Sequence, residues 1–302
     1  MNNKIGVIVP YFGDLPGYFE IFLESCISNK DIDFHIFTNN KLESAYPNIK
    51  VHKESFEAFR NRIEKSLGFQ INLKKPYKLV DYKPTYGIVL KELLAEYEFW
   101  GYSDIDLIFG DLSHFLTTEV LNSFDKIYTL GHFCLYRNNN EINNMFKNDV
   151  GMDYKKVFTS DIIHVFDETK GIQVKFDYYN LDTYKKRDFF DINPWRYNFF
   201  DSIKENSKLN SYFFWDKGKL YQMDDIGVVK ELVYVHFQKR AMSININKAT
   251  QKFYIYPEGV YDNNNNIIKP HSFYSHYCDL KFSVKHQKYI WVRRLKKYIL
   301  KR

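Results

Sequence analysis

The chain has 302 residues, of which 45% are hydrophobic and 26% charged, a composition that is ordinary for a soluble globular protein. Residues 284–302 hold eight Lys and Arg side chains and no acid, and removing those eight charges from the net +6 leaves −2 for residues 1–283. This near-neutral body argues against a nucleic-acid-binding surface, and we expect no nucleic-acid partner.

The first 140 residues alternate strand-like and helix-like segments. Residues 4–13 form a β-branched run that ends at Pro10 and Gly13, 16–30 carry apolar side chains at helical spacing, and 33–40 form a second strand. Strand, helix and strand within forty residues predict a right-handed βαβ unit. Further helices are expected at 54–68 and 86–97, and further strands at 97–104 and 126–138. We therefore expect an open α/β sheet, which binds ligands at the carboxyl ends of its strands.

The second half of the chain is less regular. It is rich in short aromatic runs, with hairpin-like pieces near 211–223 and 252–269, and no Gly/Ser-rich linker precedes it. We therefore expect an α/β protein whose second half is irregular α+β, within one domain over 1–283.

The cysteine content and the lack of long apolar segments bear on the cellular compartment. The three cysteines are far apart in the sequence and form no CxxC pair, which predicts a reducing environment and no structural zinc. The N-terminus enters a strand-like run without the features of a signal peptide, and no window approaches the roughly 20 apolar residues that span a bilayer. We expect a cytoplasmic protein.

An acidic pair follows the predicted strand at 97–104. Asp104 and Asp106 flank a single isoleucine, and two carboxylates placed so close repel each other and raise each other's pKa values. A divalent cation relieves that repulsion, since Mn²⁺ and Mg²⁺ prefer carboxylate and phosphate oxygens. The alternative is that both are turn or helix-cap residues. Their position at a strand end in a chain that opens with a βαβ unit favours the metal.

A second group of polar residues lies 130 positions further on. The strand-like segment "ELVYVHF" (231–237) contains His236, which Lys239 and Arg240 follow at i+3 and i+4. Taken alone, they are typical of a packed histidine and two solvated charges. Together with the acidic pair they predict a site for a metal-bridged diphosphate, in which the carboxylates and His236 bind the metal and Lys239 contacts phosphate oxygens.

These motifs resemble those of bacterial GT-A-fold glycosyltransferases of the capsule and O-antigen type. The resemblance implies that Asp104 and Asp106 contact Mn²⁺ or Mg²⁺ and the nucleotide ribose, and that His236 and Lys239 form a metal- and diphosphate-binding element. It also implies a nucleotide-binding half over 1–140 and an acceptor half over 141–283. The matching segments are "VIVPYFG" (7–13), "PYKLVDYKPTYG" (76–87), "FWGYSDIDLIFGDL" (99–112) and "VHFQKR" (235–240).

The resemblance extends to further nucleotide-sugar contacts and to the donor. Lys78, Asp81 and Lys83 would face the nucleotide or the sugar, with surface charge at a helix start as the alternative. Similarity to galactosyl- and galactofuranosyltransferases points to UDP-galactose or UDP-galactofuranose as the donor. Uracil and ribose contacts are implied for Pro10, Tyr11, Phe12 and Asn39.

A catalytic base is required only if the transfer inverts the anomeric centre. Asp161 follows Thr159 and Ser160 at an apparent helix start, where inverting GT-A enzymes commonly place their base, and Asp167 and Glu168 are further candidates. The alternative is that Asp161 only caps that helix. A retaining mechanism needs no such base, so the stereochemistry stays open.

The C-terminal segment 284–302 predicts a basic amphipathic helix. Its apolar side chains recur at helical spacing among the lysines and arginines, a pattern typical of a helix lying on an anionic membrane. The alternative is a helix packed on the body with a solvated basic face. The expected partners are a UDP-sugar, a glycan or lipid-linked oligosaccharide acceptor, and the inner face of the plasma membrane. A nucleotidyltransferase, a sugar-nucleotide hydrolase and a non-catalytic sugar-binding subunit are the other functions that the motifs allow.

Overall fold

The protein is described here by a computed structural model covering residues 4–194, 200, 202, 211–224, 227–238, 240, 242–247, 251–257, 259–262, 280–281, 284–285, 287–288 and 291–292. The chain divides into two compact units. The first comprises Met1–Leu107 and Leu112–Arg187, and the second comprises Ile108–Asp111 and Asp188–Arg302. The main boundary between the units lies at 187/188, whereas the two halves predicted from the sequence meet at 140/141. A single domain over 1–283 stays a prediction.

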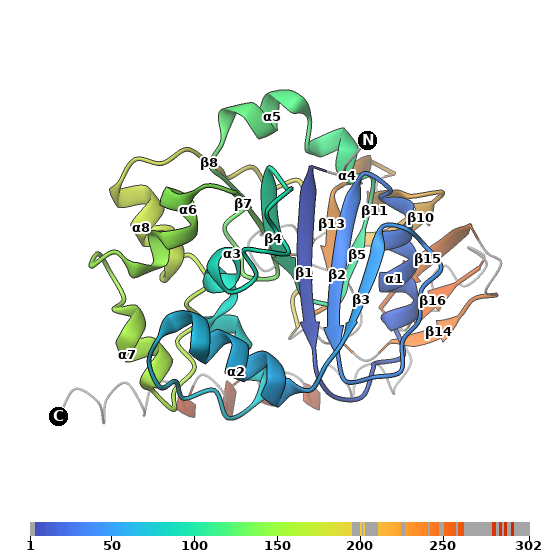
Figure 1. The fold of residues 1–302 in the computed structure, drawn as a ribbon. Helices are drawn as coiled ribbons and strands as arrows, with labels where there is room; N and C mark the ends of the chain where they lie inside the picture. The colour runs from blue at the N-terminus through green and yellow to red at the C-terminus, as the bar shows by residue number, and fades with distance from the viewer. Residues whose placement is uncertain are drawn as a thin grey trace. The chain divides into compact units, whose positions relative to one another are not determined.

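The first unit is built on a mixed seven-stranded sheet with the order β3-β2-β1-β4-β7-β6-β8 (Figure 1). The four strands from β3 to β4 are parallel, β7 is antiparallel to both β4 and β6, and β8 is parallel to β6. The Rossmann-like mixed sheet expected of a GT-A fold is thereby confirmed. The strands are β1 (Ile5–Tyr11), β2 (Ile32–Thr38), β3 (Ile49–Lys53), β4 (Phe99–Ser103), β6 (Lys126–Ile127), β7 (Phe133–Arg137) and β8 (Thr183–Tyr184).

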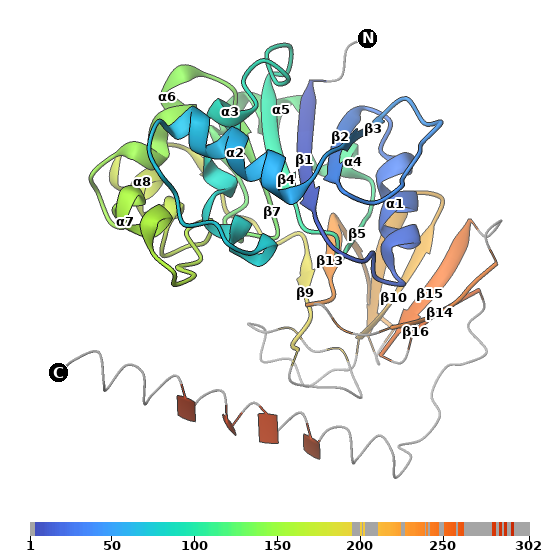
Figure 2. The ribbon, with the colours of Figure 1, turned by 60° about the horizontal axis from the view of Figure 1, so that its bottom comes forward.

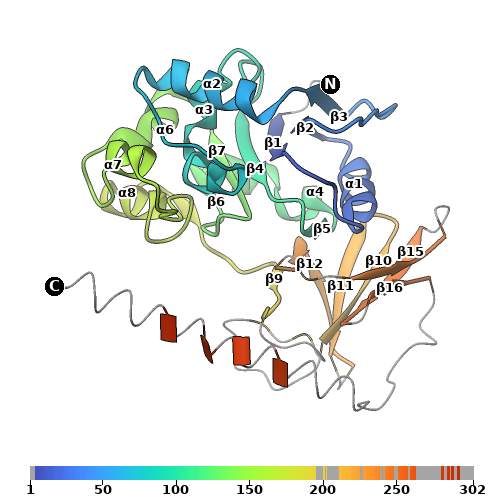
Figure 3. The same cartoon turned by 90° about the horizontal axis from the view of Figure 1, so that it is seen from below.

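Helices cover both faces of this sheet. Figure 3, which views the parallel strands close to end-on, shows α1 on one face and α2 and α3 on the other. Helix α2 is capped at its N-terminus by Ser55, whose side chain accepts the Ala58 N–H, and at its C-terminus by Gly68 in the left-handed conformation. The helices of this unit are α1 (Phe19–Ser28), α2 (Phe56–Leu67), α3 (Tyr86–Val89), α4 (Leu112–Phe115), α5 (Thr118–Ser123), α6 (Asn140–Asn144), α7 (Tyr154–Thr159) and α8 (Ile172–Tyr178), with 3₁₀ turns η1 (Pro76–Asp81), η2 (Lys83–Thr85) and η3 (Met145–Lys147).

Two predicted elements of the first unit are wrong in extent. The helix expected over 86–97 is α-helical only over Tyr86–Val89 and continues as turns. The strand expected over 126–138 is instead the antiparallel pair β6 and β7. The chain reverses between them in a turn where the Phe133 N–H donates to the Leu130 carbonyl. Tyr128 before the turn has a φ of 65°, and a Cβ at Gly131 within it would overlap the Asp167 carboxylate.

The second unit contains two sheets. Strands β10 (Ser211–Asp216) and β11 (Lys219–Asp224) form the predicted hairpin, whose turn residues Lys217 and Gly218 both have positive φ. The predicted hairpin near 252–269 is present as β15 and β16, which share a sheet with β10 (Figure 2). The six-stranded sheet has the order β12-β11-β10-β15-β16-β14, and the three-stranded sheet has the order β5-β13-β9. The remaining strands of the two sheets are β5 (Leu107–Phe109), β9 (Phe190–Asp191), β12 (Val229–Leu232), β13 (Tyr234–His236), β14 (Ser243–Asn245), β15 (Lys252–Tyr256) and β16 (Gly259–Tyr261).

The predicted C-terminal helix lies largely outside the described residues. Those that are described within 284–302 are helical and exposed, and the side chain of Trp291 is 64% exposed. Among the helices that the structure describes, none combines the length and the hydropathy that crossing a bilayer requires.

Candidate active site

Three parallel strands of the first unit end at one edge of the sheet. Strand β1 lies between β2 and β4, with Tyr11 opposite Thr38 and Ile8 opposite Tyr102. The carboxyl ends of these strands lead into Phe12, Asn39 and Asp104. The structure therefore brings the predicted nucleotide segment and the acidic pair to the same edge, where open α/β sheets bind ligands.

The loops that follow β1 and β2 are tied together. The Gly13 N–H donates to Asn39 Oδ1 at 3.1 Å, and Asn40 Nδ2 donates to the Gly13 carbonyl at 2.7 Å. Gly13 has a φ of 128°, which only glycine adopts readily, so it makes this exchange possible. The fixed loop leaves Pro10 and Tyr11 half-buried at the edge.

Phe12, predicted as a nucleotide contact, lies in the core instead. Its ring is buried and packs 5.6 Å from the ring centroids of Phe56 and Phe59 on α2. The side chain therefore stabilises the junction between β1 and α2. The neighbouring Tyr11 hydroxyl donates to the Asp14 carbonyl at 2.9 Å, which holds the ring at the strand end.

Asp104 and Asp106 have different environments. The side chain of Asp104 is 33% exposed, whereas Asp106 is buried, and carboxylate oxygens of the two lie within 4.8 Å of each other. Burial raises the pKa of Tyr18 and of Tyr11, and in both cases the Asp106 charge raises it further. The acidic pair therefore imposes a negative field on the end of β1, which a cation would neutralise.

One buried lysine already compensates part of that charge. Lys83 Nζ donates to Asp104 Oδ1 at 2.8 Å and to the Gly131 carbonyl at 2.6 Å, and it lies 3.2 Å from Asp167 Oδ2. Burial acts to lower the pKa of Lys83, but the charges of Asp104 and Asp167 outweigh it and hold that pKa above its usual value. Lys83 is thus a permanent cation that joins Asp104 to a second, more deeply buried carboxylate.

Asp167 belongs to this network through tight packing against Gly131. Burial raises the pKa of Asp167 to about 7, although Lys83 acts in the opposite direction. A Cβ at Gly131 would lie 2.6 Å from Asp167 Cγ, so only glycine leaves room for the carboxylate. The Gly131 N–H donates to Glu168 Oε1 at 3.1 Å. The sequence identified both acids only as possible bases, because nothing local shows that Lys83 reaches Asp167 from 84 positions away.

Lys78 and Asp81, predicted to face the nucleotide or sugar, are buried and occupied by protein partners. Their charged groups pair at 2.8 Å, and Lys78 Nζ also donates to the Ile162 carbonyl at 2.6 Å. The Asp81 carboxylate accepts the backbone N–H groups of His164 and Phe166 at about 3.1 Å. The pair anchors the segment that follows α7.

Asp161 does not lie at a helix start, so that part of the prediction is wrong. Helix α7 ends at Thr159, and its N-terminus is capped by Asp153, whose carboxylate accepts the Lys155 N–H. The Asp161 side chain is 73% exposed, and hydrogen bonds from Lys74 at 2.8 Å and Asn72 at 2.9 Å lower its pKa. It therefore caps no helix, and it is held on the surface by two residues of the preceding loop.

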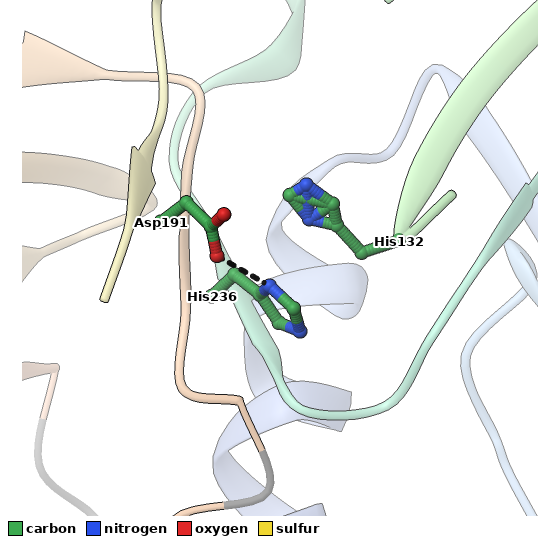
Figure 4. A group of neighbouring side chains, drawn as sticks. All are labelled: His132, Asp191 and His236. Atoms are coloured by element: carbon green, nitrogen blue, oxygen red, sulfur yellow. Dashed lines mark hydrogen bonds and ion pairs between the residues drawn. The ribbon is translucent and has the colours of Figure 1, made fainter. Parts of the chain in front are cut away.

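In the second unit, the predicted ligand His236 is oriented by a carboxylate. His236 on β13 lies opposite Asp191 on the parallel strand β9, and its Nδ1 is 2.9 Å from Asp191 Oδ1 (Figure 4). Gln238 Nε2 donates to the same oxygen at 2.6 Å. A carboxylate behind Nδ1 is the usual support of a metal-binding histidine, with Nε2 as the ligand atom. Asp191 was not predicted from the sequence, where its one distinguishing feature is that it is an acidic residue among apolar ones.

The strand that follows the acidic pair belongs to the same sheet as His236. Asp106 immediately precedes β5, and β5 is the neighbour of β13 in the three-stranded sheet. The Gly110 N–H donates to the Val233 carbonyl at 2.8 Å, and Trp215 Nε1 donates to the Phe109 carbonyl at 3.0 Å. Chain connectivity thus leads from the acidic pair directly into the sheet that carries the histidine.

The basic residues after His236 are described only in part. Lys239, the predicted diphosphate contact, lies outside the described residues. Arg240 is buried, with Nε donating to the Pro257 carbonyl at 3.2 Å and its guanidinium 5.2 Å from the centre of the Phe200 ring. These contacts give Arg240 a packing role.

Comparisons with known proteins add the following matches. A galactosyltransferase, LgtC, solved in complex with donor and acceptor sugar analogues, is 12% identical over 77% of this chain and 86% of its own, with a TM-score of 0.42. A 4-diphosphocytidyl-2C-methyl-D-erythritol synthase from Anaerococcus prevotii is 12% identical over 62% of this chain and 89% of its own, with a TM-score of 0.33. No curated protein matches the sequence significantly. The model of a family of unknown function, DUF6625, matches residues 7–264, and the chain therefore belongs to that family.

Proposed function

We propose that this protein is a metal-dependent glycosyltransferase that moves a hexose from a UDP-sugar to a glycan or lipid-linked oligosaccharide. The observation that carries the proposal is the pair Asp104 and Asp106 at the carboxyl end of β4, beside the tied loops that follow β1 and β2. A nucleotide bound along that edge would have its diphosphate close to the acidic pair, and two anionic groups so placed require a cation between them.

The proposed ligands of that cation are Asp104, Asp106 and His236, with Asp191 orienting the histidine. The donor set of two carboxylates and one imidazole suits Mn²⁺ or Mg²⁺ in the presence of phosphate oxygens. Support comes from the connection of Asp106 to β5, the sheet neighbour of β13. The ion would supply electrostatic stabilisation of the leaving diphosphate.

Lys83 has a different role in this proposal from the one that the resemblance implies. The hydrogen bonds and ion pairs described for its Nζ all go to protein oxygens, so we assign it the positioning of Asp104 rather than a contact to the sugar. Pro10, Tyr11 and Asn39 remain the proposed uracil and ribose contacts, since Pro10 and Tyr11 end β1 and Asn39 begins the loop that is tied to it. Lys239 remains the proposed contact to the diphosphate.

The stereochemical outcome separates two candidate mechanisms. In an inverting transfer, a carboxylate accepts the proton of the acceptor hydroxyl as that oxygen attacks the anomeric carbon and UDP departs. Asp161 is the base that the sequence favours, and Asp167 is the candidate that Lys83 joins to the acidic pair. A retaining transfer needs neither carboxylate as a base. Proton NMR of the product anomer, together with the rates of Asp161→Asn and Asp167→Asn, distinguishes these cases.

The proposal is tested by UDP release from a panel of UDP-sugars with Mn²⁺, including UDP-galactose and UDP-galactofuranose as the expected donors for surface-polysaccharide synthesis. We expect turnover that chelation abolishes and that Asp106→Asn and His236→Asn reduce at least 100-fold, the scale on which charge-stabilising groups act. Glu98→Gln is the matched control, because Glu98 is exposed and pairs only with Lys4 among the contacts described. No binding or turnover of any UDP-sugar would refute the proposal, and pyrophosphate release from UTP and a sugar phosphate would indicate a nucleotidyltransferase instead.

A further inference from the structure

The loop over residues 160–166, between α7 and α8, exposes aliphatic side chains to solvent. Ile162 is 60% exposed, and Ile163 and Val165 are also exposed. Tyr77, on the adjoining turn η1, is 60% exposed. Isolated apolar residues are normal on a protein surface, but four on two adjoining segments constitute a patch that requires an explanation.

Hydrogen bonds from neighbouring segments hold the backbone of this loop in place. The buried pair Lys78 and Asp81 binds the Ile162 carbonyl and the His164 and Phe166 N–H groups, as described above. At the start of the loop, Asn72 bonds both the Thr159 carbonyl and the Asp161 carboxylate. The loop therefore presents its aliphatic side chains on a fixed backbone.

One residue of the loop adopts a backbone conformation that its side chain disfavours. Val165 has a φ of 56°, and for a β-branched residue this left-handed conformation is a genuine outlier. A strained conformation persists only where the surroundings impose it, and such residues gather at functional sites. The strain leaves Val165 exposed while its neighbour Phe166 is buried.

Exposed lysines lie on the segments that adjoin the loop. Lys74 and Lys75 lie on the segment that pairs with the loop, and Lys155 and Lys156 lie on the exposed surface of α7. The exposed acids on these segments are Asp161, which Lys74 neutralises, and Asp153, which caps α7. The segments that adjoin the loop therefore carry more exposed lysines than exposed acids.

From this combination we propose that the 160–166 loop inserts into an anionic lipid bilayer, with Ile162, Ile163 and Val165 entering the acyl boundary and the lysines meeting the headgroups. Because the backbone of the loop is already fixed, little conformational entropy is lost when its exposed aliphatic side chains insert. The lysines on the adjoining segments are complementary to an anionic surface. A protein partner would be matched less well, because Lys75, Lys155 and Lys156 would remain to be compensated, whereas Lys74 already pairs with Asp161. The proposal is independent of the glycosyltransferase activity and of the C-terminal segment.

The test is the partition of the full chain onto vesicles of phosphatidylcholine with and without phosphatidylglycerol. We expect Ile162→Ser with Ile163→Ser to lower the partition coefficient on anionic vesicles at least tenfold, since two aliphatic side chains no longer leave water. Lys75→Ser with Lys156→Ser should lower it about 25-fold on anionic vesicles alone, about fivefold for each lysine. The matched control is Val228→Ser with Val229→Ser, which alters two exposed aliphatics of the second unit.

A second measurement separates insertion of the loop from binding by another part of the chain. Ile163→Trp should become quenched by brominated phosphatidylcholine in anionic vesicles, whereas Val229→Trp should not. Circular dichroism of each variant shows whether it is folded. Failure of the chain to bind vesicles, or binding that the isoleucine pair leaves unchanged without quenching at position 163, would overturn the proposal.

Discussion

Replacing Lys83 by methionine tests the network beneath the acidic pair. The substitution keeps the volume of the side chain but removes the charge-assisted hydrogen bonds to Asp104 and the Gly131 carbonyl. Hydrogen bonds that involve a charged group contribute about 1.5–3 kcal/mol, and the Asp104 carboxylate is partly exposed to water that can replace the lysine. We therefore expect the free energy of unfolding to fall by about 2–3 kcal/mol at pH 6.

The pH dependence of this loss follows from Asp167. With Lys83 present the pKa of the buried Asp167 is about 7, and without it the pKa must rise further. Below pH 7 Asp167 is protonated in both folded proteins, so the loss of unfolding free energy caused by the substitution does not change with pH. Above pH 7 Asp167 is ionised in the folded wild type and in both unfolded chains, but it stays protonated in the folded variant. The destabilisation caused by the substitution therefore grows by about 1.4 kcal/mol per pH unit.

The assay is urea unfolding of both proteins at pH 6, 7, 8 and 9, followed by far-UV circular dichroism. The control is the same substitution in an Asp167→Asn background, where the slope above pH 7 should vanish. A loss that does not change with pH, or a slope that persists in that background, would refute the reasoning.

Three further variants are expected to behave as follows. Gly131→Ala should lower the free energy of unfolding by about 1–3 kcal/mol, measured by thermal melting, since its Cβ overlaps the Asp167 carboxylate; a melting temperature equal to that of wild type would contradict this packing. Burial, with a smaller contribution from His52, lowers the pKa of His35 to about 4, so stability present above pH 6.5 should be lost as the pH falls to 4, by up to about 3 kcal/mol. His35→Asn should remove that slope from the urea midpoints, and an unchanged slope would argue against it. Asp191→Ala should weaken Mn²⁺ binding about 10–100-fold by calorimetry, through loss of the support to His236; unchanged affinity would exclude Asp191 from that role.

The parts of the fold that the sequence predicts well are those with strong local patterns. Strand β1 is a continuous apolar run, and α1 shows helical spacing, so both are readable from their own residues. Parallel strands share their carboxyl edge, and for that reason Asp104 could be assigned to a ligand-binding edge from its position after β4 alone. The reversal between β6 and β7 could not be predicted in this way, because neither the positive φ of Tyr128 nor the packing of Gly131 against Asp167 has a signal in its own segment.

The contacts of the candidate site that the sequence does not reveal are long-range ones. Lys83 meets Asp167, and His236 meets Asp191, across separations of 84 and 45 residues. Neither pairing has a signal in the local sequence, and only tertiary packing brings the two partners together. Asp161 illustrates the opposite error, since Thr159 and Ser160 suggest a helix start locally while the helix, capped by Asp153, ends there.

The central claim is that the acidic pair and His236 hold one divalent cation together with a nucleoside diphosphate. Its most direct test is the titration of Mn²⁺ into the protein with and without UDP, followed by electron paramagnetic resonance. We predict one Mn²⁺ per chain, bound more tightly with UDP present, with affinity lost in Asp106→Asn and His236→Asn and retained in Glu98→Gln. Mn²⁺ binding that is indifferent to UDP, or equal in all four proteins, would contradict the claim.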